Sequence, residues 1–220
     1  MAKFKTLEVA GWIPALKGMR NPLKSYSRID SYIGSDNHIV IGPNDYDLAR
    51  RLIIGGPPHR KFLRQICVWV DISAARFWWN EFDTYKIGTS ANSESTMHTL
   101  LKEPITLDMF EFDTNLESDI LALASTYVFE EYINGLEDTR KYIADLTDIK
   151  LKNKYLSLLK SMLPESFIQT RTVCLNYEVL SNMYYWRKDH RLPQWNTDFV
   201  NWIKTLPYNE FITQEWPEEK

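Results

Sequence analysis

Residues 163–187, LPESFIQTRTVCLNYEVLSNMYYWR, decide most of what the sequence says about the fold. Within them, Asn176, Asn182 and Arg187 are six and five residues apart, so a helix would bring the three side chains near one side over about three turns. Asn amides offer donors and acceptors to the edge of a heterocycle, and Arg can bind a phosphate through two hydrogen bonds. The pattern suits a nucleotide or a flavin, although three such residues on one helix face more often mark a solvated surface.

Helical patterns extend on both sides of this stretch. Residues 152–163 form an amphipathic helix that Pro164 ends, and residues 119–148 have helical spacing, as one helix or as two broken near Asn134 and Gly135. The helical pattern of residues 176–188 runs to a polar break at residues 188–193, and a last helix is predicted over residues 194–204, after Pro193.

The N-terminal half predicts strands and a long loop. Residues 3–13 alternate as a strand that Pro14 closes, and residues 18–43 form a loop with a short strand at residues 38–41. Asn44 is predicted to cap a helix over residues 45–54, which the GlyGlyProPro run at residues 55–58 ends. Residues 62–72 have the β-branched and aromatic content of a core strand.

Composition limits the classes of protein that the chain can belong to. With 220 residues and 44% hydrophobic content, we expect one domain over residues 1–220. The formal net charge of -3 provides no long-range field for nucleic acid or anionic membranes, and we predict neither as a partner. Cys67 and Cys174 lie in apolar surroundings, as in a reducing compartment, and no apolar run is long enough to span a bilayer, so we predict a cytoplasmic protein.

The common catalytic and metal-binding motifs are absent from the sequence. There is no GxGxxG, phosphate-binding loop or HExxH, and no cysteine and histidine spacing suited to zinc, so no metal is predicted. None of the four histidines lies within a few residues of a cysteine in a recognisable nucleophile setting, which argues against a protease or a classical hydrolase.

The stretch quoted above resembles the second signature of flavin-dependent thymidylate synthases. In that family a LeuPro pair leads, at the spacing found here from Leu163 to Asn176, into an Asn-rich helix that ends in Arg. The family's asparagines contact flavin and its arginine binds the phosphate of dUMP, which the resemblance implies for Asn176, Asn182 and Arg187. The downstream Gln194-Trp195 is similar to the family's Gln-Trp, with a small insertion before it.

A first signature is partly present in residues 59–98. His59 matches a histidine that the family places against the flavin, and the run from Ala75 to Trp79 is similar to its Ala-Arg-Gln-Trp. The family then has Arg-His-Arg and an Asn-Glu-x-Ser stretch followed by Arg. This chain has Asn80, Glu81 and Phe82, then residues 92–98, NSESTMH, so the triplet loses two cations and gains an anion. Lys86 or Arg76 is a nearby cation that can compensate.

The second signature also departs from the family pattern. Glu178 stands where an arginine is expected beside the first asparagine, and Lys160 stands where an arginine precedes LeuPro. A lysine is a point charge without the planar fork of a guanidinium, so the change at Lys160 affects how a phosphate can be held.

The resemblance implies an α/β (α+β) protein with a small mixed or antiparallel sheet packed with long helices, assembled as a homotetramer with sites between subunits. It implies synthesis of thymidylate, or of a related 5-substituted deoxyuridylate, from dUMP, with FAD as cofactor and NADPH and methylenetetrahydrofolate as co-substrates. The implied catalytic residues are Ser95, Thr96 and His98. Cofactor contacts are implied for His59, Asn80, Glu81, Asn92, Glu94, Asn176 and Asn182, and substrate contacts for Arg187, Lys160 and Arg76.

Simpler roles remain open for several of these residues. Ser93, Ser95 and Thr96 can be helix-cap or turn residues. Glu81 can pair with Arg76 or Lys86, and the PheTrpTrp run at residues 77–79 is more often core than a stacking surface. The alternative function is an altered or inactive relative that binds a nucleotide or assembles as a structural partner.

Overall fold

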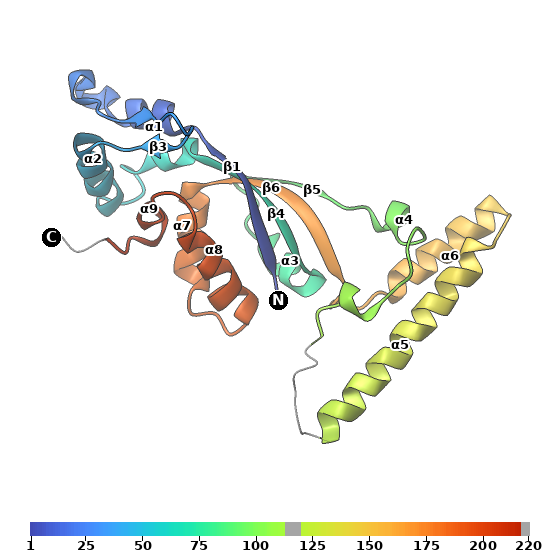
Figure 1. Ribbon diagram of the computed structural model, residues 1–220. Coiled ribbons are helices and arrows are strands. Elements are labelled where there is room, and N and C mark those ends of the chain that lie inside the picture. The colour runs from blue at the N-terminus through green and yellow to red at the C-terminus, as the bar shows by residue number, and fades with distance from the viewer. Residues whose placement is uncertain (113–119, 217–220) are drawn as a thin grey trace. The chain divides into compact units, whose positions relative to one another are not determined.

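The computed structural model describes residues 1–112 and 120–216 of the chain (Figure 1). They form a mixed α/β structure that divides into two compact units. Unit 1 comprises Met1–Ile72, Phe82–Asn92 and Thr172–Lys220, and unit 2 comprises Ser73–Glu81 and Ser93–Arg171. No helix in the described part of the chain is both long enough and apolar enough to cross a membrane.

A four-stranded sheet has the order β1-β4-β6-β5, with β1 at Lys3–Ala10, β4 at Cys67–Ala75, β6 at Ile168–Asn176 and β5 at Thr89–Ser93. The amide of Tyr177 donates to the carbonyl of Ile66 at 3.0 Å, and Thr172 Oγ1 donates to Asp71 Oδ1 at 2.6 Å. Residue numbers rise along β4 where they fall along β6, so these two central strands are antiparallel. Burial alternates strictly along Cys67–Ala74, as expected of a strand with one face in a core.

Helices of unit 1 surround an aromatic core. They are α1 at Trp12–Met19, α2 at Pro43–Ile54, α7 at Tyr177–Arg187, α8 at Val200–Lys204 and α9 at Glu210–Thr213. Trp12 packs edge-on against Tyr177, with ring centroids 5.1 Å apart, and Phe211 is fully buried beside them. A six-residue π-helical stretch, Gln194–Phe199, leads into α8 and buries Trp195 and Phe199. The unit also contains the short strands β2 (Tyr32–Ile33) and β3 (Ile39–Val40) and the 3-10 turns Asn21–Leu23, Tyr26–Arg28 and Lys61–Gln65.

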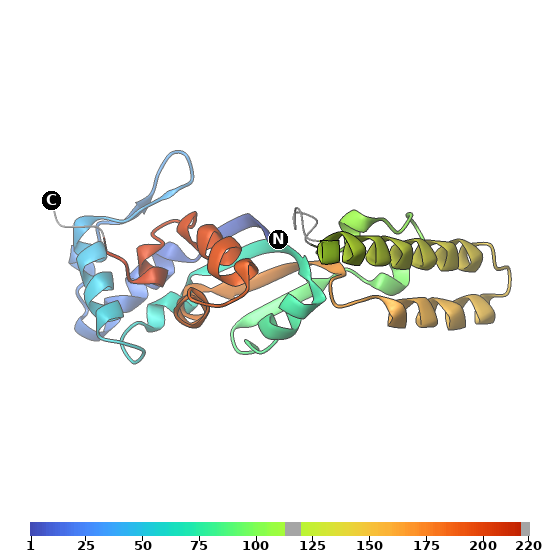
Figure 2. The ribbon, with the colours of Figure 1, turned by 90° about the horizontal axis from the view of Figure 1, so that it is seen from below.

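Unit 2 is organised around a pair of long helices, α5 at Ile120–Ala144 and α6 at Ile149–Met162, which lie side by side (Figures 1 and 2). Leu136, Ile143 and Leu159 are completely buried between them and form the centre of this core. Asp148 caps α6, because its carboxylate accepts hydrogen bonds from the amides of Lys150 and Leu151. Shorter elements are α3 at Arg76–Phe82, α4 at Thr96–Thr99 and a 3-10 turn at Leu107–Met109.

Most of the predicted elements are present with shifted ends. The opening strand stops at Ala10, and Pro14 lies in the first turn of α1, where the missing N–H has no helical partner to lose. The core strand starts at Cys67, because Lys61–Gln65 is a 3-10 turn. The short strand at residues 38–41 and the helices ended by Pro164 and begun after Pro193 are confirmed.

Of the two alternatives for residues 119–148, the single helix is the one found, because α5 continues through Asn134 and Gly135, which are exposed between the buried Ile133 and Leu136. Two details of the prediction are wrong. The cap of α2 is Gly42 and not Asn44, since the carboxylate of Asp30 accepts hydrogen bonds from the amides of Asn44 and Asp45 at 2.8 and 3.0 Å. Asn176 is the last residue of β6 and the N-cap of α7, so it precedes the helix that carries Asn182 and Arg187. Asp119, where the long helix was predicted to begin, lies outside the described residues.

Candidate functional site

The first turn after β4 brings Arg76 and Asn80 to one wall of a cavity in unit 2. The amides of Arg76 and Phe77 donate to the carbonyls of Phe167 and Glu165 at 3.0 and 3.1 Å, which fixes the start of α3. Arg76 Nη1 also donates to the carbonyl of Leu163 at 3.3 Å, and Asn80 Nδ2 donates to Glu165 Oε2 at 3.0 Å. The LeuPro segment therefore orients the Arg76 guanidinium through a backbone oxygen.

The aromatic residues beside Arg76 belong to the core of this wall. Trp78 and Trp79 are both buried, and their rings pack edge-on with centroids 5.0 Å apart. Trp79 Nε1 donates to the carbonyl of Gln169 at 2.9 Å, and the guanidinium carbon of Arg171 lies 4.1 Å from the centroid of the Trp79 ring. Trp79 thus holds β6 and Arg171 in place, and both tryptophans belong to the core rather than offering a free stacking surface, as the core interpretation expected.

Glu94, Ser95 and Thr96 provide the opposite wall. Glu94 is tied to β6 by three hydrogen bonds, because its amide donates to the carbonyl of Thr170 (3.0 Å), its carbonyl accepts from Gln169 Nε2 (2.9 Å) and its Oε2 accepts from the amide of Thr170 (3.1 Å). Ser95 is the N-cap residue of α4 by position, but its hydroxyl makes no capping hydrogen bond.

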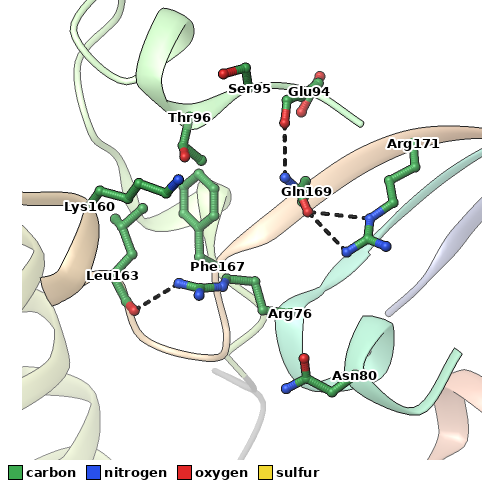
Figure 3. A pocket seen from close by; sticks show the side chains of 10 residues that line it. All are labelled: Arg76, Asn80, Glu94, Ser95, Thr96, Lys160, Leu163, Phe167, Gln169 and Arg171. Atoms are coloured by element: carbon green, nitrogen blue, oxygen red, sulfur yellow. Dashed lines mark hydrogen bonds between the residues drawn. The ribbon is translucent and has the colours of Figure 1, made fainter. Parts of the chain in front are cut away.

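These walls enclose a cavity of about 410 Å³, which we name the Arg76 cavity (Figure 3). A volume of this size is in the range of small-molecule sites. Three cations, Arg76, Lys160 and Arg171, face a single carboxylate, Glu94. The lining residues are Arg76, Asn80, Glu94, Ser95, Thr96, Lys160, Leu163, Phe167, Gln169 and Arg171, and the first six of these were predicted from the sequence.

Asn176 and Asn182 line a different cavity, of about 830 Å³, in unit 1, which we name the Asn176 cavity. Asn176 Oδ1 accepts a hydrogen bond from the amide of Val179 at 3.0 Å, so its carbonyl oxygen caps α7. Asn182 lies within α7 and is exposed. The loop after the tryptophans completes the wall, and the lining residues are Pro57, Arg60, Arg64, Thr84, Tyr85, Lys86, Ile87, Gly88, Asn176, Glu178, Val179 and Asn182.

Glu178 and Arg187 have partners that account for their positions. Arg60 Nε lies 3.1 Å from Glu178 Oε2, and both side chains are largely buried. Arg187 Nε donates to Tyr85 Oη at 2.9 Å, and its guanidinium carbon lies 4.8 Å from the centroid of Trp195. Arg187 does not line the Asn176 cavity itself, but it holds Tyr85, which does.

Besides Arg187, four of the predicted site residues line neither cavity. Glu81 is half-buried on α3, Asn92 is exposed on β5 and His98 is exposed on α4. His59 is exposed in unit 1 and lines a third cavity, together with Arg20 and Lys61. Roles implied for these residues by the resemblance remain predictions.

Several lining residues were missed by the sequence reasoning. Phe167, Gln169 and Arg171 line the Arg76 cavity from β6 and the residue before it, a strand that was not predicted. The alternation of Gln169, Arg171 and Val173 with small or apolar neighbours was the available signal, because residues two apart on a strand share a face.

Comparison with known proteins supports the fold but not a family assignment by sequence. No family model matches the chain, and no curated protein matches it. Among solved structures, the chain is similar to thymidylate synthase X (ThyX) from Helicobacter pylori with FAD and dUMP, with a TM-score of 0.65 and 17% identity over 97% of this chain and 98% of that one. A second structure of the same enzyme, complexed with FAD and dUMP, has a TM-score of 0.65 and 18% identity over 96% and 98% of the two chains.

The chain therefore has the flavin-dependent thymidylate synthase fold, a mixed α/β structure with a small sheet and many helices, and the predicted fold class is confirmed. The two solved structures are of an enzyme that was crystallised with a flavin and a pyrimidine nucleotide.

Proposed function

We propose that the chain binds a pyrimidine nucleotide, dUMP or a close relative, and FAD, and that it carries out a flavin-dependent thymidylate synthase type of reaction. The observation that carries this proposal is that six residues predicted from the sequence line one cationic cavity in a chain with this fold. The whole-chain charge of -3 makes a cavity with three cations and one carboxylate a local feature and not a consequence of composition.

The nucleotide is assigned to the Arg76 cavity on chemical grounds. A phosphate needs cations that are held in position, and Arg76 is fixed by Leu163 while Arg171 is fixed by Trp79. Lys160 adds a flexible ammonium group. Hydroxyls of Ser95 and Thr96 can donate to and accept from a pyrimidine or a ribose, which fits positioning of the base without a cysteine nucleophile.

The Asn176 cavity is suited to an extended heterocyclic cofactor. Its volume of about 830 Å³ is twice that of the other cavity, and Tyr85, Ile87 and Val179 give it apolar walls beside the amides of Asn176 and Asn182. FAD, when bound, supplies the hydride that reduces a transferred methylene group, and NADPH and methylenetetrahydrofolate are the proposed co-substrates. Arg187 would act here by positioning Tyr85.

A second candidate is a relative that binds the nucleotide without catalysing the reaction. Two observations favour it. Asn80 donates to Glu165 where the family has a cation, and Glu178 pairs with Arg60 in the wall of the Asn176 cavity. The proposed enzyme oxidises NADPH only when dUMP and FAD are present, whereas the non-catalytic relative binds dUMP and leaves NADPH unchanged.

The nucleotide assignment is tested by exchanging one cation of α6 for alanine. Lys160→Ala removes an ammonium group from the Arg76 cavity, and we expect the dissociation constant for dUMP to rise by about tenfold in calorimetric titration. Lys154→Ala is the matched control, because Lys154 is an exposed lysine of the same helix that does not line the cavity. Equal affinity of the two variants for dUMP would rule the cavity out.

The flavin assignment is tested separately on α7. Asn182→Ala removes an amide from the Asn176 cavity, and we expect it to weaken FAD binding, measured by quenching of flavin fluorescence. Asn201→Ala is the control, since Asn201 is exposed on α8 in the same unit and lines no described cavity. A wild-type protein that takes up no FAD at all would refute the flavin part of the proposal while leaving the nucleotide part standing.

A further inference from the structure

A third cavity, of about 470 Å³, lies within unit 1 and carries a concentration of basic side chains. We name it the Arg20 cavity. Arg20, Arg28, Arg51 and Lys61 line it together with His59, and none of its described lining residues has a carboxylate. The chain as a whole has three more acidic than basic side chains, so this basic lining is a local feature. Such a lining favours the binding of anions.

Arg20 is fixed at the base of this arrangement. Its side chain is 3% exposed, its Nε donates to Asp45 Oδ1 at 2.6 Å, and its Nη1 lies 3.5 Å from Ser25 Oγ. Nη2 is buried and has no hydrogen-bond partner among the described residues. A buried donor without an acceptor is unfavourable, so the guanidinium can accommodate an acceptor that the described residues do not supply.

Asp45 neutralises Arg20 without competing for the ligand. It is fully buried, and its Oδ2 accepts hydrogen bonds from the amides of Asp30 and Ser31 and from Ser31 Oγ, at 3.1, 3.1 and 2.7 Å. Burial alone would raise the pKa of Asp45, but the hydrogen bonds from Ser31 and Arg20 lower it below its ordinary value, so the carboxylate stays ionised. Arg20 therefore supplies oriented donors rather than net charge.

The net positive charge comes from the rim of the cavity. Arg28 and Lys61 are exposed and have no ion-pair partner within the residues that the structure describes. Arg51 pairs with Asp47 at 2.8 Å, but both side chains are about two-thirds exposed, so water screens the pair and Arg51 can exchange partners.

The remaining lining of the cavity is apolar. Met19, Leu23, Leu48, Leu52 and Phe62 contribute hydrocarbon surface beside the cations. A free inorganic ion would leave that surface in contact with water, whereas a molecule with an anionic group and an apolar body would cover it. From this juxtaposition we propose that the Arg20 cavity binds a small organic oxyanion, with its phosphate or carboxylate at the cations and its apolar body on the Leu and Phe side chains.

The proposed ligand site is separate from the nucleotide and flavin assignments. The Arg20 cavity shares no lining residue with the Arg76 cavity or the Asn176 cavity. His59 lines the Arg20 cavity, whereas Asn176 and Asn182, which the resemblance assigned to the same cofactor, line the Asn176 cavity.

Phenyl phosphate is a suitable probe, because it combines a phosphate with an apolar ring. We expect the wild-type protein to bind phenyl phosphate more tightly than inorganic phosphate in calorimetric titration, and not to bind phenol. Benzoate, compared with phenyl phosphate, distinguishes a carboxylate site from a phosphate site. Either anion supports the proposal, and equal binding of phenol would overturn it.

The location is tested with Arg28→Gln/Lys61→Gln, two exposed changes that leave the Arg20–Asp45 pair intact. We expect phenyl phosphate to bind about tenfold more weakly to this variant, while Lys17→Gln, an exposed lysine of α1 outside the cavity, leaves binding unchanged. An unchanged affinity in the double variant, a loss of affinity in Lys160→Ala instead, or displacement of the probe by FAD would overturn the proposal. The binding of dUMP is expected to be the same in the double variant and in the wild type, so a failure of this site and a failure of the nucleotide site give different results.

Discussion

Gly88 illustrates how single residues shape the candidate site. Its φ is 78°, and a Cβ built there would lie 2.9 Å from Val179 Cγ2 and 3.1 Å from Asn176 Nδ2 in the Asn176 cavity. Only glycine meets both demands without cost, because other residues are strained at positive φ and their Cβ would displace the α7 cap. The loop after the tryptophans can therefore approach the start of α7 closely.

Replacing this glycine is expected to be more harmful than replacing another one with similar backbone geometry. Gly56 has a φ of 86° but open space within 4 Å of the place that a Cβ would take, so Gly56→Ala should cost about 1 kcal/mol from backbone strain alone. Gly88→Ala should cost about 2 kcal/mol in free energy of unfolding, because the contacts with Val179 and Asn176 are added. Urea denaturation of both variants measures the difference. Equal losses would mean that Val179 and Asn176 move aside without cost.

Glu137 links α5 to the chain segment that precedes it. Its carboxylate accepts two hydrogen bonds from Arg140, at 2.6 and 2.7 Å, and one from the amide of Ile105 at 2.7 Å. The hydrogen bonds from Arg140 lower its pKa from 4.5 to about 2, against the opposing effect of burial. This contact joins Ile105, which is buried in the unit 2 core, to the middle of the long helix.

The stabilisation from Glu137 should depend on pH in a defined direction. Because the folded state favours the ionised form, the contribution is complete above pH 4.5 and is lost as the pH falls toward 2. Glu137→Gln should lower the free energy of unfolding by roughly 1–3 kcal/mol at pH 7 and by clearly less at pH 3. Urea denaturation of wild type and variant at the two pH values measures this, and a difference that does not change with pH would contradict the assigned ion pair.

At the level of elements, helices were more predictable than the strand that completes the site. Helix α6 is capped by Asp148 and followed by Pro164, and both signals are local in the sequence. Strand β6 carries polar residues whose partners are distant in the sequence. Gln169 contacts Glu94, Thr170 contacts Ser73, and Arg171 packs on Trp79. These distant partners cannot be read from local sequence, and the alternation of Gln169, Arg171 and Val173 was the local signal that the prediction did not use.

The candidate site was only partly predictable, because its residues come from elements that are distant in the sequence. Arg76, Asn80, Glu94 and Lys160 line one cavity. The resemblance implied all four as site residues, but it assigned Arg76 and Lys160 to the substrate and Asn80 and Glu94 to the cofactor. His59 matches a histidine of the family's motif, and His98 lies in the stretch that departs from it, yet both are exposed and lie outside that cavity, His59 on a turn and His98 on α4. Motif spacing constrains position along the chain, whereas the cavity depends on which elements pack together.

At the level of the whole molecule, apolar side chains remain exposed on the long helix of unit 2. Tyr127 and Val128 are 64% and 66% exposed on α5, and Val128 lines a shallow cavity with Phe129 and Tyr132. Contiguous apolar surface of this kind is common where identical subunits meet. The homotetramer implied by the resemblance would cover it.

We predict that native mass spectrometry of the purified protein gives a species of four 26.0-kDa subunits, with any bound flavin visible as added mass.

Val128→Glu places a charge on the exposed apolar face of α5 and should shift the protein toward smaller species with an unchanged circular dichroism spectrum, because burying an unpaired carboxylate at an interface is costly. Ser157→Glu introduces the same charge at an exposed polar position of α6 and should leave the assembly intact. A wild-type protein that is monomeric at micromolar concentration would contradict the tetramer, and it would require each proposed binding site to be complete within one chain.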